Sequence, residues 1–104
     1  MKVIWSDFAS NMLSDIYQYY IEVAGHKVAQ KIKSGIFQST RKLIKHPNSG
    51  PTEELLKQLG EDHRFLVKGN YKIIYLHVKE GILITDVFDT RQDPIKINDE
   101  KRKH

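Results

Sequence analysis

Apolar residues recur at helical spacing along the first half of the chain. Between residues 7 and 24 they fall three or four positions apart, with acidic and amide side chains between them, which predicts an amphipathic helix. Ser6 is a typical N-cap for this helix, and Gly25 is a typical stop. The preceding segment 2–5, KVIW, predicts a short strand.

A second helix is predicted from residue 26 to residue 45. At about 100° per residue, one face of this helix collects apolar side chains and the opposite face collects lysine and arginine. The apolar positions are Val28, Ala29, Ile32, Ile36 and Leu43. Gly35 either weakens the helix or lets another segment pack closely against it. The segment 46–51, HPNSGP, ends the helix in a loop.

The second half of the chain has the composition of β-strands. Segments 64–67, 70–78 and 82–89 are rich in β-branched and aromatic residues, and glycine-containing turns at 68–70 and 79–81 join them. Segment 52–62 allows helical turns ended by Gly60 or a loose connection. The predicted fold class is α+β in the order β-α-α-β-β-β, an antiparallel sheet with two helices packed on one face. We expect one domain over residues 1–98 and a charged, frayed tail over residues 99–104.

Composition narrows the classes of function. The 104 residues contain no cysteine, which excludes disulfides and thiolate chemistry and suits a reducing cytoplasm. No apolar run approaches the roughly 20 residues of a membrane span, and the N-terminus does not read as a signal peptide. We therefore expect a cytoplasmic protein with no membrane partner. No set of His, Asp and Glu has metal-ligand spacing, so we expect neither a metal nor another cofactor.

The net charge of +4 is unevenly distributed, because residues 23–52 contain no Asp or Glu. A basic surface favours an anionic partner, either nucleic acid or an acidic protein, although a solvated helix face is the simpler alternative. The candidate nucleic-acid-binding residues are four lysines of the second helix and one of the next strand: Lys27, Lys31, Lys42, Lys45 and Lys68.

Four segments carry a resemblance to a known family: WSDFA (5–9), HPNSG (46–50), RFLVKGNYKIIY (64–75) and VFDTRQDP (87–94). In this order the chain resembles, over about residues 3–95, the RelE/ParE toxins of bacterial type II toxin–antitoxin systems, which include plasmid stabilisation proteins. The resemblance implies a β-α-α-β-β-β fold with an open sheet face, and an antitoxin that wraps and silences the toxin. RelE-like members cut mRNA in the ribosomal A site without a metal, whereas ParE-like members inhibit DNA gyrase.

The resemblance also assigns candidate catalytic residues. Two cationic positions of RelE-like members match Lys72 and Arg91, and Arg64 on the neighbouring strand could join them. Cations there would neutralise the phosphorane formed when a ribose 2′-hydroxyl attacks the next phosphate. This requires that Lys72 and Arg91 meet in one solvent-open pocket. Arg91 could instead form an ion pair with Asp89 or Asp93.

The chain departs from the nuclease pattern at several positions. Lys72 stands where an arginine is usual and lacks its bidentate fork. After Arg91 there is no tyrosine and no histidine before His104, so His63 is a candidate substitute base. The first hypothesis is a toxin that cleaves mRNA on the ribosome as a metal-independent endoribonuclease, with a cognate antitoxin as partner. The alternatives are a ParE-type toxin that binds DNA gyrase and a non-catalytic nucleic-acid-binding module.

Overall fold

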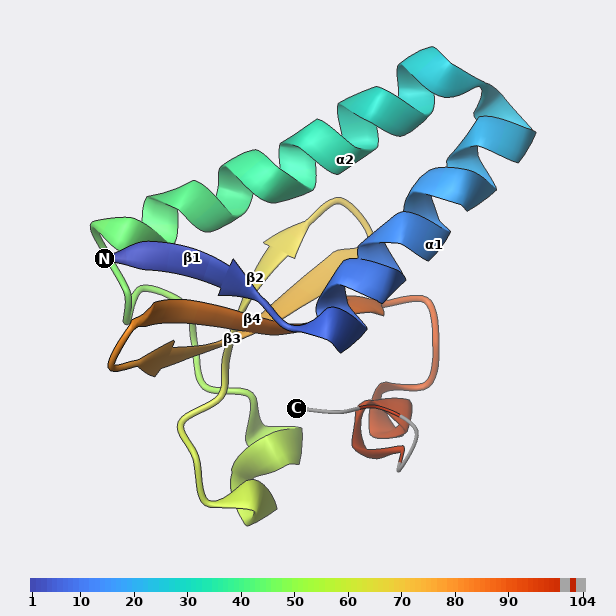
Figure 1. Ribbon diagram of the computed structural model, residues 1–104. Coiled ribbons are helices and arrows are strands. Elements are labelled where there is room, and N and C mark those ends of the chain that lie inside the picture. The colour runs from blue at the N-terminus through green and yellow to red at the C-terminus, as the bar shows by residue number, and fades with distance from the viewer. Residues whose placement is uncertain (100–101, 103–104) are drawn as a thin grey trace.

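The computed structural model describes residues 1–99 and residue 102. Within these residues the strands and long helices follow the predicted order: β1 (Lys2–Trp5), α1 (Asp7–Ala24), α2 (His26–Arg41), β2 (Arg64–Lys68), β3 (Tyr71–Val78) and β4 (Gly81–Asp89). Two short 3₁₀ helices, η1 (Lys42–Ile44) and η2 (Glu54–Leu59), lie between α2 and β2, and a third, η3 (Pro94–Asn98), follows β4. The expected α+β fold class is confirmed, with both long helices on one side of the sheet (Figure 1).

The four strands form one sheet in the order β1-β4-β3-β2. β2, β3 and β4 form the antiparallel meander that their short turns predict. β1 differs from the expected antiparallel pattern, because it lies parallel to β4, from which α1, α2, β2 and β3 separate it along the chain. Lys2 lies opposite Gly81, and a Cβ atom at Gly81 would come within 2.0 Å of the Lys2 carbonyl oxygen. The close approach of β1 therefore requires glycine at position 81.

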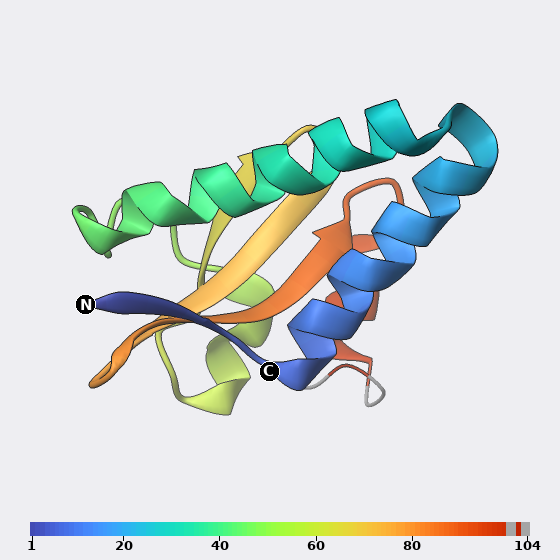
Figure 2. The same ribbon diagram turned by 45° about the horizontal axis from the view of Figure 1, so that its top comes forward.

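The ends of the long helices follow local signals, with two corrections. The Ser6 hydroxyl accepts a hydrogen bond from the Ala9 N–H at 3.1 Å, and Gly25 follows α1 at a φ of 90°. α2 ends at Arg41 rather than at residue 45, because the chain tightens there into the 3₁₀ turn η1. Val28, which the helical pattern places on the apolar face, is 42% exposed. It belongs to the α1–α2 corner, which projects beyond the sheet (Figure 2).

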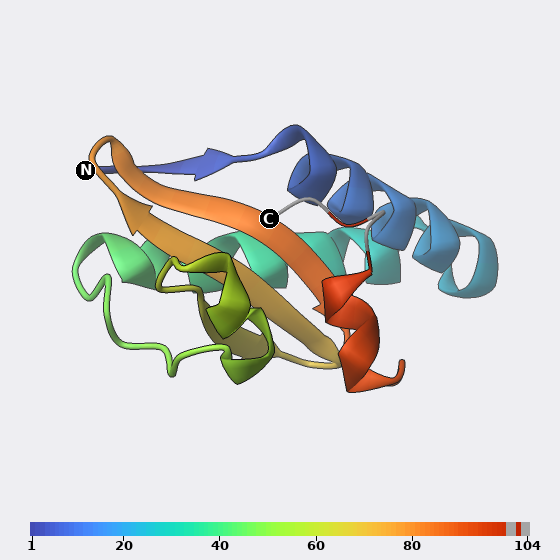
Figure 3. The same ribbon diagram turned by 90° about the horizontal axis from the view of Figure 1, so that it is seen from below.

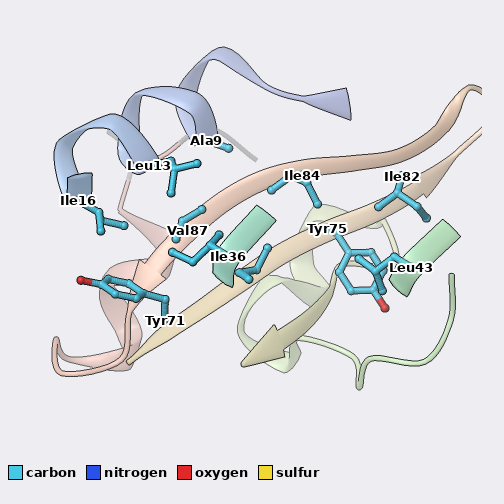
Figure 4. Packing of buried hydrophobic residues seen from close by; sticks show 11 residues of the cluster. Ala9, Leu13, Ile16, Ile36, Leu43, Tyr71, Tyr75, Ile82, Ile84 and Val87 are labelled. Carbon is cyan, nitrogen blue, oxygen red and sulfur yellow. The ribbon is translucent and has the colours of Figure 1, made fainter. Parts of the chain in front are cut away.

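The main core lies between the sheet and the two long helices. Figure 4 shows α1 and α2 side chains interdigitating with inward-facing residues of β3 and β4. The buried residues shown there are Ala9, Leu13, Ile16, Ile36, Leu43, Tyr71, Ile73, Tyr75, Ile82, Ile84 and Val87. The alternation along β3 thus places its tyrosines towards the helices, as the period-2 pattern predicts.

The opposite face of the sheet is covered, in contrast to the open face that the family resemblance implied. η2 and η3 lie across this face (Figure 3). Leu56 of η2 and Ile97 of η3 pack on Ile74 and Phe88, which are 0% and 3% exposed. Segment 52–62 therefore contains a 3₁₀ helix that buries an apolar patch of the sheet, and it is not a loose connection.

The predicted frayed tail falls partly outside the described residues, at positions 100–101 and 103–104. Arg102 is described, and its guanidinium pairs with the Asp86 carboxylate of β4, at 2.7 Å from Nε and 2.5 Å from Nη2. Their side chains are 11% and 0% exposed. At Arg102 the expectation of a frayed tail is therefore wrong. None of the helices in the described part of the chain is both long and apolar enough to cross a membrane.

Candidate functional site

The two cations expected to act together do not share a pocket. Successive residues of a strand point to opposite faces of its sheet, and Tyr71 belongs to the core on the helix side. Lys72 therefore points to the face covered by η2. Arg91 follows the end of β4 and lines a hollow with Tyr71 and Met12 of α1. In contrast to the sequence-based expectation, the Lys72 amine and the Arg91 guanidinium do not converge.

Lys72 is held by a carboxylate of the segment before η2. Its Nζ lies 2.5 Å from Glu53 Oε2 and 4.2 Å from the centre of the Phe65 ring. The Lys72 and Glu53 side chains are 23% and 4% exposed. Glu53 also accepts a hydrogen bond from the Leu55 N–H at 3.3 Å, which caps η2. The ion pair thus fastens η2 to the sheet, and much of the lysine charge is neutralised within the protein.

Arg91 forms a bidentate ion pair with Asp89, which is one of the two alternatives left open by the sequence. Nε and Nη2 of Arg91 lie 2.9 and 2.8 Å from the two carboxylate oxygens. These hydrogen bonds raise the pKa of Arg91 and lower the pKa of Asp89 from their ordinary values. The Arg91 side chain is 53% exposed, so other N–H donors of the guanidinium remain accessible to an anion.

Arg64, the third candidate catalytic residue, holds the loop that follows η1. Its Nε lies 2.9 Å from the Asp62 carboxylate, and its Nη1 donates to the Asn48 and Gly50 carbonyl oxygens at 3.2 and 2.9 Å. Tyr75 also holds this loop, because its hydroxyl accepts a hydrogen bond from the Gly50 N–H at 2.9 Å. These contacts give Arg64 a structural role, which is to hold the loop after η1 against β2.

Arg91 and Asp89 line a hollow of about 390 Å³ that lies between the end of β4 and α1. Tyr19 and Tyr71 line it together with Met12. The Tyr71 hydroxyl donates to the Tyr20 hydroxyl at 3.3 Å. Burial raises the pKa of Tyr71, and the hydrogen bond with Tyr20 raises it further. Tyr71 is therefore protonated at neutral pH and is unsuited to act as a general base.

The histidine considered as a substitute base lies inside the protein. His63 is 1% exposed, so an RNA substrate could reach its ring only after the surrounding segments move. His46 and His77 lie at the surface. Within residues 1–99 and 102, no group of three or more His, Cys, Asp and Glu side chains could hold a metal ion.

The candidate nucleic-acid-binding lysines, at positions 27, 31, 42, 45 and 68, all lie exposed. Lys31 and Lys68 line a second hollow, of about 490 Å³, between α2 and the β2–β3 turn. The sequence did not indicate that these two lysines meet, although Gly35 signalled a close approach to α2. The sequence also did not indicate that Glu53 pairs with Lys72, because their contact depends on the path of the loop that carries Glu53.

The protein is thus a small α+β domain in which two long helices cover one face of the sheet. Each face of the sheet carries a cation that is partly neutralised by a carboxylate, Lys72 on one and Arg91 on the other. The family model for the ParE toxin of the type II toxin–antitoxin system parDE matches residues 3–94, and the chain belongs to this family. A chain in a solved structure of the chromosomal ParDE toxin–antitoxin system from P. aeruginosa has the same fold, with a TM-score of 0.70 and 20% sequence identity. That match covers 86% of this chain and 95% of the other. Among curated proteins, none matches the sequence.

Proposed function

We propose that this ParE-family toxin arrests growth by binding DNA gyrase and does not cleave mRNA. The observation that carries the proposal is the separation of Lys72 and Arg91 onto different faces of the sheet, each beside its own carboxylate. Metal-independent cleavage needs several groups around one phosphate, because proton transfer and charge stabilisation occur in the same transition state. Binding to a protein target needs no such convergence.

The carboxylate partners also count against cleavage. Lys72 would have to leave Glu53, whose side chain is 4% exposed, and that would leave a buried charge without its partner. Arg91 is more accessible, but Asp89 places a negative charge beside any phosphate that approaches it. The ParE identity of the matched family agrees with gyrase as the target, since gyrase inhibition is the activity that the ParE resemblance implies.

Two reactions run side by side would test the proposal. The purified full chain is added to gyrase with relaxed plasmid and ATP, and separately to ribosomes that carry mRNA with a defined codon in the A site. We expect loss of supercoiling in the first reaction and intact mRNA in the second. In cells, induction of the toxin is expected to stop DNA synthesis before protein synthesis.

A variant of the toxin shows whether any cleavage in the mRNA reaction depends on Arg91. Arg91→Gln removes the exposed guanidinium charge and leaves the buried residues unchanged. Cleavage by the natural chain that disappears in Arg91→Gln would establish a nuclease and overturn the gyrase proposal. Normal supercoiling at a toxin concentration that stops growth would overturn it as well.

A further inference from the structure

One edge of the second long helix carries a row of cationic side chains with a gap at its centre. At about 100° per residue, positions 27, 31, 35, 38 and 42 fall within roughly 80° of one another, so they follow one edge of α2 and the start of η1. In order, the row contains Lys27, Lys31, Gly35, Gln38 and Lys42. Glycine is unfavourable inside a helix by about 1 kcal/mol relative to alanine, so its presence there calls for a structural reason.

Lys68 of β2 occupies the gap. A Cβ atom at Gly35 would lie 3.1 Å from Lys68 Cε and 3.9 Å from Lys68 Nζ. The β2–β3 turn lies against the middle of α2 (Figure 2), and the end of the Lys68 side chain lies beside Gly35, where the helix has no side chain. Its ammonium group thereby continues the cationic row. Within residues 1–99 and 102, neither Lys31 nor Lys68 forms an ion pair.

The hollow beside this row combines apolar walls with the two cations. Ile32 and Ile36 of α2 line it together with Tyr71 of β3, and Lys31 and Lys68 contribute their charges. The residues that line it include no Asp or Glu. A ligand that complements the hollow therefore needs an apolar group next to an anionic one.

Nucleic acid fits this hollow less well than an acidic peptide does. Single-stranded nucleic acid is held by cations along its backbone and by aromatic rings on which bases stack. Tyr71 is 5% exposed and its hydroxyl is bonded to Tyr20, so it offers no open ring face for a base. A peptide can instead place a leucine- or tyrosine-like side chain in the hollow and a neighbouring carboxylate beside Lys68.

We propose that the cationic row and the adjoining hollow form a docking surface for an acidic peptide segment with apolar anchor residues, supplied by the cognate antitoxin. An anchor side chain enters the hollow over Ile32, and carboxylates of the segment pair with Lys31 and Lys68. The inference rests on membership of a toxin–antitoxin family and is independent of gyrase as the target. Because the walls are apolar, an ion pair formed there is less screened by water than one on open surface.

The binding test uses the purified full chain and a random copolymer of glutamate and tyrosine as the probe. Lys68→Ala is expected to weaken binding of the copolymer about fivefold, the upper range for a partly exposed ion pair. Lys79→Ala is the matched control, since it removes the same charge from the exposed β3–β4 turn, at the opposite end of β3 from Tyr71. We expect the affinity of this control to stay close to that of the natural chain.

Gly35→Ala is a second variant that keeps every charge. Its new methyl group would contact Lys68 Cε at 3.1 Å and displace the end of that side chain, which is flexible. Alanine also favours the helix, so the fold is expected to be retained or strengthened. We expect weaker binding of the copolymer together with an unchanged or higher unfolding temperature.

The outcomes are decisive in both directions. Selective weakening by Lys68→Ala and Gly35→Ala supports the docking surface. No binding of the copolymer, or equal weakening by Lys68→Ala and Lys79→Ala, overturns it. A single-stranded thymidine oligonucleotide is tested in parallel. If its affinity depends on Lys68 more than that of the copolymer does, the surface serves nucleic acid and the proposal is wrong. Supercoiling by gyrase is a separate measurement, so either proposal can fail without the other.

Discussion

The two sheet faces hold similar ion pairs that differ in what surrounds them. Lys72 and Glu53 are separated by 19 residues in sequence, and the glutamate is 4% exposed. Arg91 and Asp89 are two residues apart, and their side chains are 53% and 27% exposed. The first pair joins a loop to the sheet, whereas the second orders one exposed turn. We therefore expect the Lys72–Glu53 pair to contribute to stability. The Arg91–Asp89 pair is expected to contribute little and to leave Arg91 accessible to a binding partner.

Two of the three candidate catalytic residues that the family resemblance assigned, Lys72 and Arg91, therefore differ in how freely they can contact a ligand. A cation that is enclosed by its carboxylate and by an aromatic ring, as Lys72 is, has little freedom to contact a ligand. Arg91 keeps accessible donors and borders a hollow. Of these two cations, Arg91 is the one that a partner can reach without unfolding any segment.

The largest effect is expected when Lys72 is neutralised. Lys72→Met leaves the buried Glu53 carboxylate without its cation, and removal of one partner of a buried pair typically costs about 3 kcal/mol. We expect a loss of that size in the free energy of unfolding, measured by urea denaturation. Adding Glu53→Gln to Lys72→Met should restore part of the stability, because the unpaired charge is then absent. A double variant no more stable than the single one would show that the pair is not the cause.

The next effect concerns the loop after η1, which Tyr75 and Arg64 hold. Tyr75 is 0% exposed, and its hydroxyl accepts the Gly50 N–H at 2.9 Å. Tyr75→Phe leaves that buried N–H without its acceptor, and a buried unsatisfied donor costs about 2 kcal/mol. Urea denaturation should show this loss, and amide hydrogen exchange at Gly50 should accelerate. Unchanged exchange at Gly50 would mean that water or another group replaces the hydroxyl.

Tyr71→Phe is the matched change at the start of β3, on the same face of the sheet, and is expected to cost less. The Tyr71 hydroxyl donates to another hydroxyl, on Tyr20, at the longer distance of 3.3 Å, and the bond is only partly buried. Because Tyr20 can then bond to water, we expect a loss of about 0.5 kcal/mol, measured in the same urea experiments. A loss as large as that of Tyr75→Phe would show that the burial and length of the hydrogen bond do not determine its contribution to stability.

The sequence predicted those features that neighbouring residues determine. Ser6 and Gly25 fix the ends of α1 through contacts within a few residues, and both behave as predicted. The alternation of Tyr71 and Lys72 also placed them correctly on opposite faces, since side-chain direction in a strand follows from its geometry. For Arg91 the sequence offered Asp89 and Asp93 as alternatives to a phosphate partner, and the structure pairs Arg91 with Asp89.

The features that the sequence did not predict depend on where loops travel. Glu53 reaches Lys72 only because segment 52–62 turns back over the sheet, and no periodicity in that segment indicates its path. The meeting of Gly35 and Lys68 likewise depends on how α2 crosses the β2–β3 turn. The sequence therefore supplied candidate residues for the site, but it predicted neither the separation of Lys72 and Arg91 onto two faces nor the cover over one of those faces.

The smallest effect is expected from the exposed pair, and it depends on pH. Hydrogen bonds from Arg91 hold the pKa of Asp89 below its ordinary value, so the folded state binds this proton less tightly than the unfolded chain does. The stabilisation from the pair is therefore present above the unfolded pKa, about 3.9, and is lost as the pH falls through the lower folded value. Asp89→Asn should lower stability slightly at pH 7 and should converge with the natural chain in strong acid.

Urea denaturation at a series of acidic pH values measures this convergence. Glu61→Gln, which changes an exposed carboxylate outside the ion pairs found in the described residues, is the control and should follow the natural chain across the series. If Asp89→Asn lowered stability as much as Lys72→Met, the exposed pair would be a structural element comparable to the buried one. The proposed difference between the two faces would then be wrong, and Arg91 would have to be assigned to maintaining the fold rather than to binding a partner.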